Sequence, residues 1–367
     1  MSKGQASTVW PLDAHSRGKH QLLQAYLEAW FPILGASFSR VVFVDGFAGP
    51  GRYAGGEDGS PLISLKTFLR SQVRDKPASF FFIEENAARV ERLRRTLAEL
   101  EPMVPPSVRW EVVPGRFDAS VPEVLKHVRP ASQQAAPSFV MADPFGVSHT
   151  PMSVLQEILR NERAEVYVSF MWGWLNRFKT HPEMGPHLDG LFGCSTWREA
   201  IEIQETAQRR RFVYSLYERQ LRLAGAKYVL HFDLYRERQL VYSIFFATKS
   251  PLGADKMKQA IWKIAPLGDF AYRGSRSPQL DLGLSTVDFR PLRNALLDAF
   301  RGGPAVSVED VAAFVLESTD FHSGQYKGLL AEMEREGVLQ VADAPRNRKR
   351  GSFPGGTKMF FVRGLFG

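Results

Sequence analysis

The chain has 367 residues, of which 44% are hydrophobic, so it can bury a large core and is not a disordered protein. Lys and Arg outnumber Asp and Glu by 47 to 39, and this basic balance favours a polyanionic partner such as nucleic acid. The single cysteine, Cys194, excludes an internal disulfide and a metal site built from cysteines. No apolar run reaches the ~18 residues that a membrane-spanning helix needs, and a signal peptide is not evident, so we expect a cytoplasmic protein.

The first periodic segment begins at Lys19, where apolar residues recur at intervals of three and four up to Leu34 and predict an amphipathic helix. Five apolar runs then alternate with segments that permit helices. The runs are VVFV at 41, SFFFI at 79, VRWEVV at 108, PSFVMA at 137 and EVYVSFM at 165. Because most of these runs are continuously apolar, helices should cover both faces of their sheet, as in parallel α/β folds.

Two further strands follow a predicted helix, RRRFVYSLYERQLRLAG, that begins with Arg209, Arg210 and Arg211 on a face expected to be solvated. The strands are KYVLHFDLY and QLVYSIFFATK, and only a few residues connect them. That connection is too short for a parallel crossover, so the two strands should form an antiparallel hairpin. The pattern predicts an α/β fold, and five parallel strands followed by an antiparallel hairpin resemble the sheet of Rossmann-like methyltransferases.

Beyond about Pro291 the pattern changes to three short helices followed by a hairpin with a charged tip, which predicts a winged-helix-like domain. We therefore expect two domains. The first covers residues 1–290, with an N-terminal helix and an insertion near 172–207, and the second covers residues 291–367.

The predicted wing carries five basic residues that can bind phosphates: Arg346, Arg348, Lys349, Arg350 and Lys358. The third helix argues against base reading, because Glu332, Glu334 and Glu336 crowd the position of a recognition helix. A wing that grips the nucleic-acid backbone, a protein-docking module and a merely solvated hairpin all remain open.

A glycine loop follows the first apolar run, in the stretch VVFVDGFAGPGRY at 41–53. A buried strand that ends in an acid and runs into closely spaced glycines is typical of a loop whose backbone approaches a nucleotide-like cofactor. The candidate residues are Asp45, Gly46, Phe47, Gly49 and Gly51. The alternative is a structural turn between a strand and a helix.

The later strands also end in residues that can act at a ligand site, because ligands in such sheets bind outside the carboxyl ends of the strands. The second strand ends in Glu84 and Glu85, and the third leads to Asp118. The fourth ends in a DPFG motif formed by Asp143, Pro144, Phe145 and Gly146. Together these strand ends predict a functional site, although DPFG alone can be an ordinary turn.

Several motifs resemble the three-Cys-motif partner protein (TcmP) family, whose members look like S-adenosylmethionine-dependent methyltransferases. The matching segments touch most of residues 18–265: GKHQLLQAYLEAW, FVDGFAGPGRYAGGEDGSPL, FFIEEN, DPFG, VSFM to LNRF, and PLGADKMKQAIWKI. The C-terminal unit also resembles that family's tail. The resemblance implies S-adenosylmethionine as cofactor and a partner protein that bears a three-cysteine motif.

The same motifs are similar to those of a bacterial adenine-N6 methyltransferase that acts on large-subunit ribosomal RNA. That similarity implies roles for individual residues. Lys19 and His20 would approach the methionine carboxylate, and residues 46–51 the methionine portion. Glu84 or Glu85 would bind the ribose, and Asp118 would lie near the adenine ring.

The DPFG motif can activate an amine, because an exocyclic amine attacks a methyl group poorly until hydrogen-bond acceptors draw its lone pair out of the ring. Asp143 and the Pro144 carbonyl can supply those acceptors, while Phe145 stacks on an extruded base. The sequence departs from the Asp-Pro-Pro-aromatic pattern of amino-methyltransferases, since Gly146 stands where the ring is expected. The target amine is therefore left open.

Other segments keep two interpretations each. The residues Trp172, Trp174, Asn176 and Arg177 can line a substrate pocket or cover the core. Cys194 is favoured as an ordinary buried thiol over a catalytic nucleophile, and the histidines show no metal-ligand spacing, so we assign no metal. The competing function is a binding subunit that keeps the cofactor fold and works with the three-Cys-motif partner.

Overall fold

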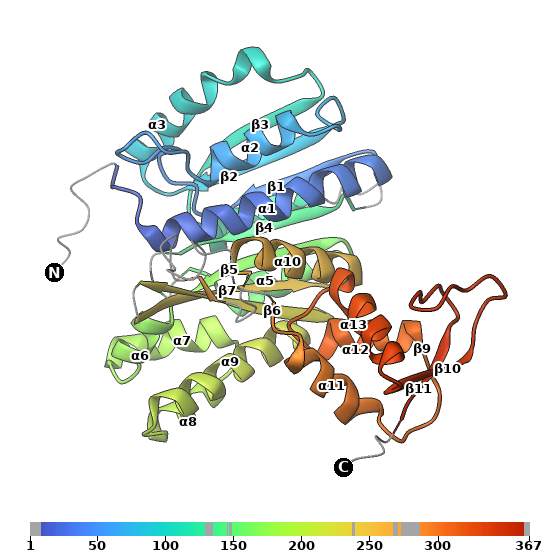
Figure 1. The fold of residues 1–367 in the computed structure, drawn as a ribbon. Helices are drawn as coiled ribbons and strands as arrows, with labels where there is room; N and C mark the ends of the chain where they lie inside the picture. The colour runs from blue at the N-terminus through green and yellow to red at the C-terminus, as the bar shows by residue number, and fades with distance from the viewer. Residues whose placement is uncertain are drawn as a thin grey trace. The chain divides into compact units, whose positions relative to one another are not determined.

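The computed structural model describes residues 9–128, 135–144, 146, 149–236, 239–266, 271–272 and 287–362 (Figure 1). The chain divides into two compact units. The first contains the residues up to Ala254 and one short strand at 271–272. The second begins at Asp255 and contains the C-terminal elements.

The first unit is built on one eight-stranded sheet of order β3-β2-β1-β4-β5-β7-β6-β8. Strands β1 to β5 are parallel, and β7 pairs antiparallel with both β5 and β6. The predicted hairpin and the predicted Rossmann-like methyltransferase sheet are therefore confirmed. The strands are β1 Val41–Asp45, β2 Ala78–Glu84, β3 Val108–Pro114, β4 Ser138–Ala142, β5 Ala164–Phe170, β6 Tyr228–Arg236, β7 Gln239–Thr248 and β8 Ala271–Tyr272.

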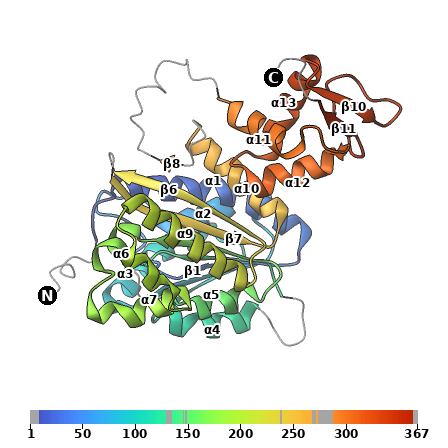
Figure 2. The same ribbon diagram turned by 90° about the horizontal axis from the view of Figure 1, so that it is seen from below.

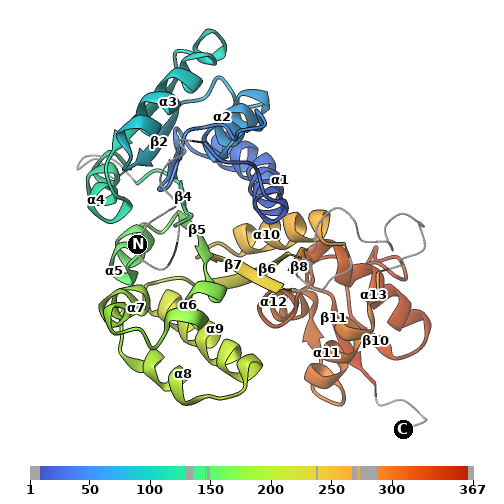
Figure 3. The same ribbon diagram turned by 90° about the vertical axis from the view of Figure 1, so that its left-hand side faces the viewer.

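Helices cover both faces of this sheet (Figure 3). Helices α1 (Ala14–Ser37) and α2 (Ser60–Arg70) pack on one face, and α4 (Phe117–Val128), α5 (Met152–Leu159) and α9 (Thr206–Leu223) on the other. Helix α3 (Ala87–Ala98) lies along β2 and β3. Between β5 and α9 come three short helices: α6 Trp172–Phe178, α7 Gly185–Phe192 and α8 Glu199–Glu202.

The two faces of the central strands are both buried, which explains the continuous apolar runs. On the α1 face, Phe43 stacks on Phe139 with ring centroids 5.7 Å apart, and Tyr26 of α1 contacts Phe139 at 5.6 Å. The alternate residues Val42 and Val44 belong to the core cluster shared with α4 and α5. Successive side chains of a strand point to opposite faces of the sheet, so each central strand contributes to two separate apolar layers.

Arg209 corrects the expectation that the arginines opening α9 are solvated, because its side chain is buried. Its guanidinium donates to the carbonyls of Ala200 and Ile203 and, over 2.8 Å, to Oδ1 of Asn176. Arg209 therefore fastens the segment between β5 and α9 to α6. Three consecutive arginines give no sequence signal that the side chain of one of them is buried.

The second unit contains a winged helix, as predicted, in which helices α11, α12 and α13 accompany a three-stranded sheet of order β10-β11-β9 (Figure 2). Its elements are α11 Arg290–Phe300, β9 Val306–Ser307, α12 Val308–Ser318, α13 Ser323–Arg335, β10 Leu339–Asp343 and β11 Lys358–Phe361. Within the described residues, no helix is both long enough and apolar enough to cross a membrane.

Most of helix α10 (Pro251–Ile264) also belongs to this second unit. The buried Lys258 amine donates to the carbonyls of Val315 and Leu316, at 3.1 and 2.7 Å, and so caps the C-terminal end of α12. The Asp255 carboxylate accepts from the backbone amide and hydroxyl of Ser323, both at 2.7 Å. One face of α10 therefore completes the α12–α13 turn.

The buried Glu165 of β5 predicts a pH-dependent stability. Its carboxylate accepts from the hydroxyls of Tyr26 at 2.5 Å and Thr248 at 2.9 Å, and burial raises its pKa from 4.5 to about 7. The folded state therefore binds this proton more tightly than the unfolded state, and the stabilisation that protonation gives is lost as pH rises from 4.5 through 7.

Glu165→Gln removes that titration. The free energy of unfolding of the variant, relative to wild type, should rise by ~3 kcal/mol between pH 4.5 and 8 in denaturant titrations, at about 1.36 kcal/mol per pKa unit. Glu162→Gln is the control, because the Glu162 side chain is 78% exposed. A Glu165→Gln variant whose pH profile parallels that of wild type contradicts the assignment.

Candidate functional site

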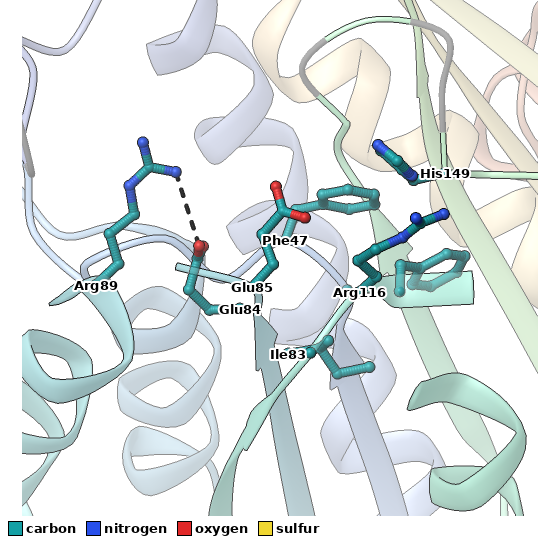
Figure 4. Close-up of a pocket in the computed structure, with 10 residues that line it drawn as sticks. Phe47, Ile83, Glu84, Glu85, Arg89, Arg116 and His149 are labelled. Carbon is teal, nitrogen blue, oxygen red and sulfur yellow. Dashed lines mark ion pairs between the residues drawn. The ribbon is translucent and has the colours of Figure 1, made fainter. Parts of the chain in front are cut away.

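Two adjoining pockets lie at the carboxyl ends of β1, β2 and β4. The first holds about 360 Å³ of space and is lined by Phe47, Glu84, Glu85, Arg89, Arg116 and His149, among others (Figure 4). The second holds about 400 Å³ and is lined by Trp10, His20, Phe47, Gly49, Tyr53 and Asp143, among others. Phe47 of the predicted glycine loop lines both pockets and so lies at the boundary between them.

The loop after β1 needs glycine for two physical reasons. A Cβ built on Gly46 would lie 2.2 Å from the Phe117 ring, which stacks on Phe47 at 5.5 Å. Gly49 and Gly51 have φ angles of +63° and +85°, where side chains with a Cβ are strained. The backbone is thereby free to lie close to a ligand.

The two adjacent acids at the end of β2 have different roles. Glu84 is buried, and its carboxylate accepts the backbone amides of Gly49 at 3.0 Å and Asn86 at 2.9 Å. Glu85 is exposed to the first pocket, and its carboxylate lies between Glu84 and Arg89 on one side and Arg116 and His149 on the other (Figure 4). Glu84 therefore holds the loop, while Glu85 is available to a ligand.

Asp118 is placed beside the first pocket but is engaged by Arg116, whose guanidinium donates to both carboxylate oxygens at 3.1 and 2.6 Å. Arg116 itself lines the pocket. Asp118 is therefore held by Arg116, a pocket residue for which the sequence predicted no role.

Lys19, His20 and Asp143 come together in the second pocket region, although 124 positions separate Lys19 from Asp143. The buried Lys19 amine donates to Oδ2 of Asp143 and lies over the Tyr242 ring. Burial alone lowers the pKa of Lys19, but the charge of Asp143 reverses this effect and raises the pKa above its ordinary value. Lys19 is therefore a cation at neutral pH.

His20 has the opposite character. Burial, and then the charge of Lys19, lower its pKa to about 3, so the imidazole is neutral. Its Nε2 lies 3.4 Å from the Tyr53 hydroxyl. Burial likewise raises the pKa of Asp45 to about 6, against hydrogen bonds from Ser60 and the Phe47 amide. Asp45 Oδ2 is buried and has no hydrogen-bond partner among the described residues.

The DPFG motif is only partly described. Asp143 and Pro144 follow β4, and Gly146 has a φ angle of +118°, but Phe145 lies outside the described residues. A Cβ on Gly146 would lie 3.9 Å from the ring of Trp174 on α6. Trp174 therefore supplies an aromatic side chain next to the motif.

The pockets include residues that lie outside the sequence motifs, among them Trp10, Arg89 and His149. Tyr53 ends the glycine-loop motif, but the sequence predicted no role for it. The Arg89 guanidinium lies over the Trp10 ring at 4.9 Å, and Trp10 packs edge-on against Tyr53. His149 has a φ angle of +76° in the loop after β4. Position near a strand end was the one signal available for Arg89 and His149.

The basic wing residues divide into two kinds. Arg346, Lys349, Arg350 and Lys358 are exposed. Arg348 instead pairs with Glu334 of α13 at 2.6 Å and lies over the Phe353 ring, with a side chain only 12% exposed. Arg348 therefore holds the wing against α13, and its charge is largely committed there.

Within the described ranges, no group of three His, Cys, Asp or Glu residues is arranged to hold a metal ion. Cys194 is only partly buried and packs against the apolar core beneath α5 and α9.

The different roles of Glu84 and Glu85 give a stability test. Glu84→Ala leaves two backbone amides without their acceptor and should lower the free energy of unfolding by about 2 kcal/mol or more. Glu85→Ala, on an exposed side chain, should change it by less than about 0.5 kcal/mol. Denaturant titration of both variants checks the difference, and equal losses would show that Glu84 does not hold the loop.

Residues 269–346 match a family model described as a GMT-like wHTH domain. No curated protein matches the chain.

Several solved methyltransferase structures resemble the chain. The N-terminal domain of human METTL16 in complex with SAH has a TM-score of 0.31 at 10% identity, covering 60% of this chain and 68% of that one. The DszA carbon methyltransferase has a TM-score of 0.38 at 13% identity, covering 65% and 55%. Precorrin-6y C5,15-methyltransferase from Geobacter metallireducens has a TM-score of 0.30 at 11% identity, covering 62% of this chain and 87% of that one. The chain thus spans about half of the DszA structure, and at these identities the likeness concerns the fold alone.

Proposed function

We propose that the protein is an S-adenosylmethionine-dependent methyltransferase that modifies an exocyclic amine of a nucleic-acid base. The observation that carries this proposal is the position of Asp143. Its carboxylate follows β4 and lines the same pocket as His20 and the glycine loop. A hydrogen-bond acceptor for an amine thus stands beside the predicted cofactor cradle.

The residues present fit such a cofactor. Gly49 leaves the loop backbone open, and Glu85 offers a carboxylate to a ribose diol. Asp45 Oδ2, buried and without a partner among the described atoms, suits the cationic part of a methionine moiety. When bound, the cofactor supplies a methyl group on a positively charged sulfur. The stacked rings of Phe47 and Phe117 form an apolar wall of the first pocket that would exclude water from the methyl group.

Asp143 has one oxygen for the substrate. Oδ2 takes the hydrogen bond of Lys19, which leaves Oδ1 as an acceptor toward the pocket. An amine that donates one proton to Oδ1 and the other to the Pro144 carbonyl keeps its lone pair on nitrogen rather than in the ring. Holding that nitrogen in line with the methyl group lowers the barrier without a strong base.

The substrate class follows from charge and from the second unit. The chain is basic overall, and a winged helix with four exposed cations on or near its wing suits a phosphate backbone. The acids of α13 remain unsuited to reading bases, since Glu334 is paired with Arg348 and Glu336 with Arg293. We therefore propose that the winged helix delivers nucleic acid without selecting its sequence.

The resemblance to the three-Cys-motif partner proteins adds a proposed partner, a protein that carries three cysteines, in the cytoplasm. This chain has Cys194 alone and so leaves any cysteine-bound metal to that partner. Co-purification of the two proteins from cells that express both would test the association.

Cofactor binding gives the first test of the function. Calorimetric titration with S-adenosylmethionine and S-adenosylhomocysteine should show saturable binding. Glu85→Ala should weaken it about tenfold, the effect of losing a charged hydrogen bond. Glu111→Ala is the matched control, an exposed acid of β3 outside both pockets. A folded protein that binds neither ligand but holds nucleic acid would make the binding-subunit alternative correct.

The role of Asp143 gives the second test. Asp143→Ala should abolish transfer of a radioactive methyl group to unmodified RNA or DNA while cofactor affinity changes less than about threefold, because the acceptor acts on the amine. Asp189→Ala, an acid on α7 that is paired with Arg198, is the control. If wild type transfers methyl groups and Asp143→Ala does so equally well, the proposed role of Asp143 is wrong.

A further inference from the structure

A second concave surface lies on the first unit, between α6, the start of α9 and the β6–β7 hairpin. These elements lie side by side in Figures 2 and 3. The groove holds about 1060 Å³ of space, and its lining includes Trp172, Asn176, Arg177, Arg210, Tyr235 and Leu240. Three of the four residues that the sequence suggested for a substrate pocket thus line this groove, while Trp174 lies beside Gly146.

The charge of the groove is positive where a ligand can reach it. Arg177 is exposed and has no carboxylate partner among the described residues. Glu205 also lines the groove, but its carboxylate accepts the amides of Ala207 and Gln208 at 2.8 and 2.6 Å. The oxygens of that carboxylate are engaged in capping α9, and among the described residues it forms no ion pair with Arg177.

Arg210 is held in place by residues of β6. Its guanidinium lies 3.7 Å from the Asp233 carboxylate and donates to the Tyr235 hydroxyl at 3.4 Å. Asp233 in turn accepts from the Ser243 hydroxyl, which also bonds the buried Tyr214 hydroxyl at 2.5 Å. A buried polar network that orients a surface arginine and a tyrosine is typical of a binding surface fixed in advance.

Helix α6 contributes both to the groove and to the surroundings of the candidate catalytic site. Trp174 lies beside Gly146, and Asn176 and Arg177 of the same short helix line the groove. A chain that enters the site at Asp143 can therefore continue across α6 into the groove.

We propose that this groove binds the single-stranded segment of nucleic acid that flanks the modified base; the inference rests on the proposed methyltransferase function. Guanidinium groups neutralise phosphates, and the planes of Tyr235 and Arg177 suit unstacked bases. A duplex hides the faces of its bases, so a surface that combines cations and rings favours a single strand.

The test compares charge reversals on the full-length protein. Arg177→Glu reverses the free groove cation, and Arg219→Glu is the matched control, an exposed arginine farther along α9 and outside the groove lining. Both are made in wild type and in a background that removes three of the four exposed wing charges by the substitutions Arg346→Ala, Lys349→Ala and Arg350→Ala. Fluorescence anisotropy then measures binding of a labelled oligouridine of about 20 nucleotides, an oligothymidine of the same length and a duplex.

Arg177→Glu should weaken single-strand binding about tenfold and reduce its logarithmic salt slope by about one, whereas Arg219→Glu should change affinity less than about twofold. The effect should be larger in the background with fewer wing charges, where the groove supplies more of the affinity. Oligouridine and oligothymidine distinguish RNA from DNA.

Calorimetry with S-adenosylmethionine on the same samples separates the two proposals. Normal cofactor binding with lost strand binding in Arg177→Glu supports the groove. Failure of wild type to bind cofactor, with the Arg177→Glu defect still present, overturns the methyltransferase function but keeps the groove as a nucleic-acid surface. Equal affinities of Arg177→Glu and Arg219→Glu, absence of single-strand binding in wild type, or a defect confined to the duplex each overturn the inference.

Discussion

The hydrogen bonds of the Glu84 carboxylate organise the rest of the site. This buried side chain at the end of β2 accepts the amide of Gly49 from the loop after β1 and the amide of Asn86 at the start of α3. One acid therefore fixes the relative positions of a strand, a helix and a glycine loop. Phe47 lies in the loop that this acid holds and borders both pockets, and Glu85 follows Glu84 in the chain and lines the first pocket.

Much of the fold could be predicted from the sequence because its signals are local. Continuous apolar runs indicated strands buried on both faces, and the short connection after Tyr235 required an antiparallel hairpin. The winged helix was visible in three short amphipathic segments and a basic turn. Burial of Arg209 was not predictable, because its partners are backbone carbonyls that give no side-chain pattern.

The site residues that follow strands could be predicted from the sequence, and the other site residues could not. The glycine loop and Asp143 follow strands, where ligands of such sheets bind. Which of two neighbouring acids faces the pocket depends on the loop that Glu84 binds, and a sequence does not show that contact. Trp10 reaches the second pocket from a distant segment and lies in no recognisable motif. Tyr53 ends the glycine-loop motif, yet the motif does not show that its ring lines the pocket beside Trp10.

The cap that Lys258 places on α12 has a consequence for how the winged helix can be isolated. The matched family region begins at residue 269, yet the amine that satisfies the last carbonyls of α12 and the carboxylate that begins α13 come from α10. A fragment cut at 269 exposes those backbone groups to water and frays the ends of both helices. Expression of this unit as a stable fragment therefore requires the chain from about Pro251 onward.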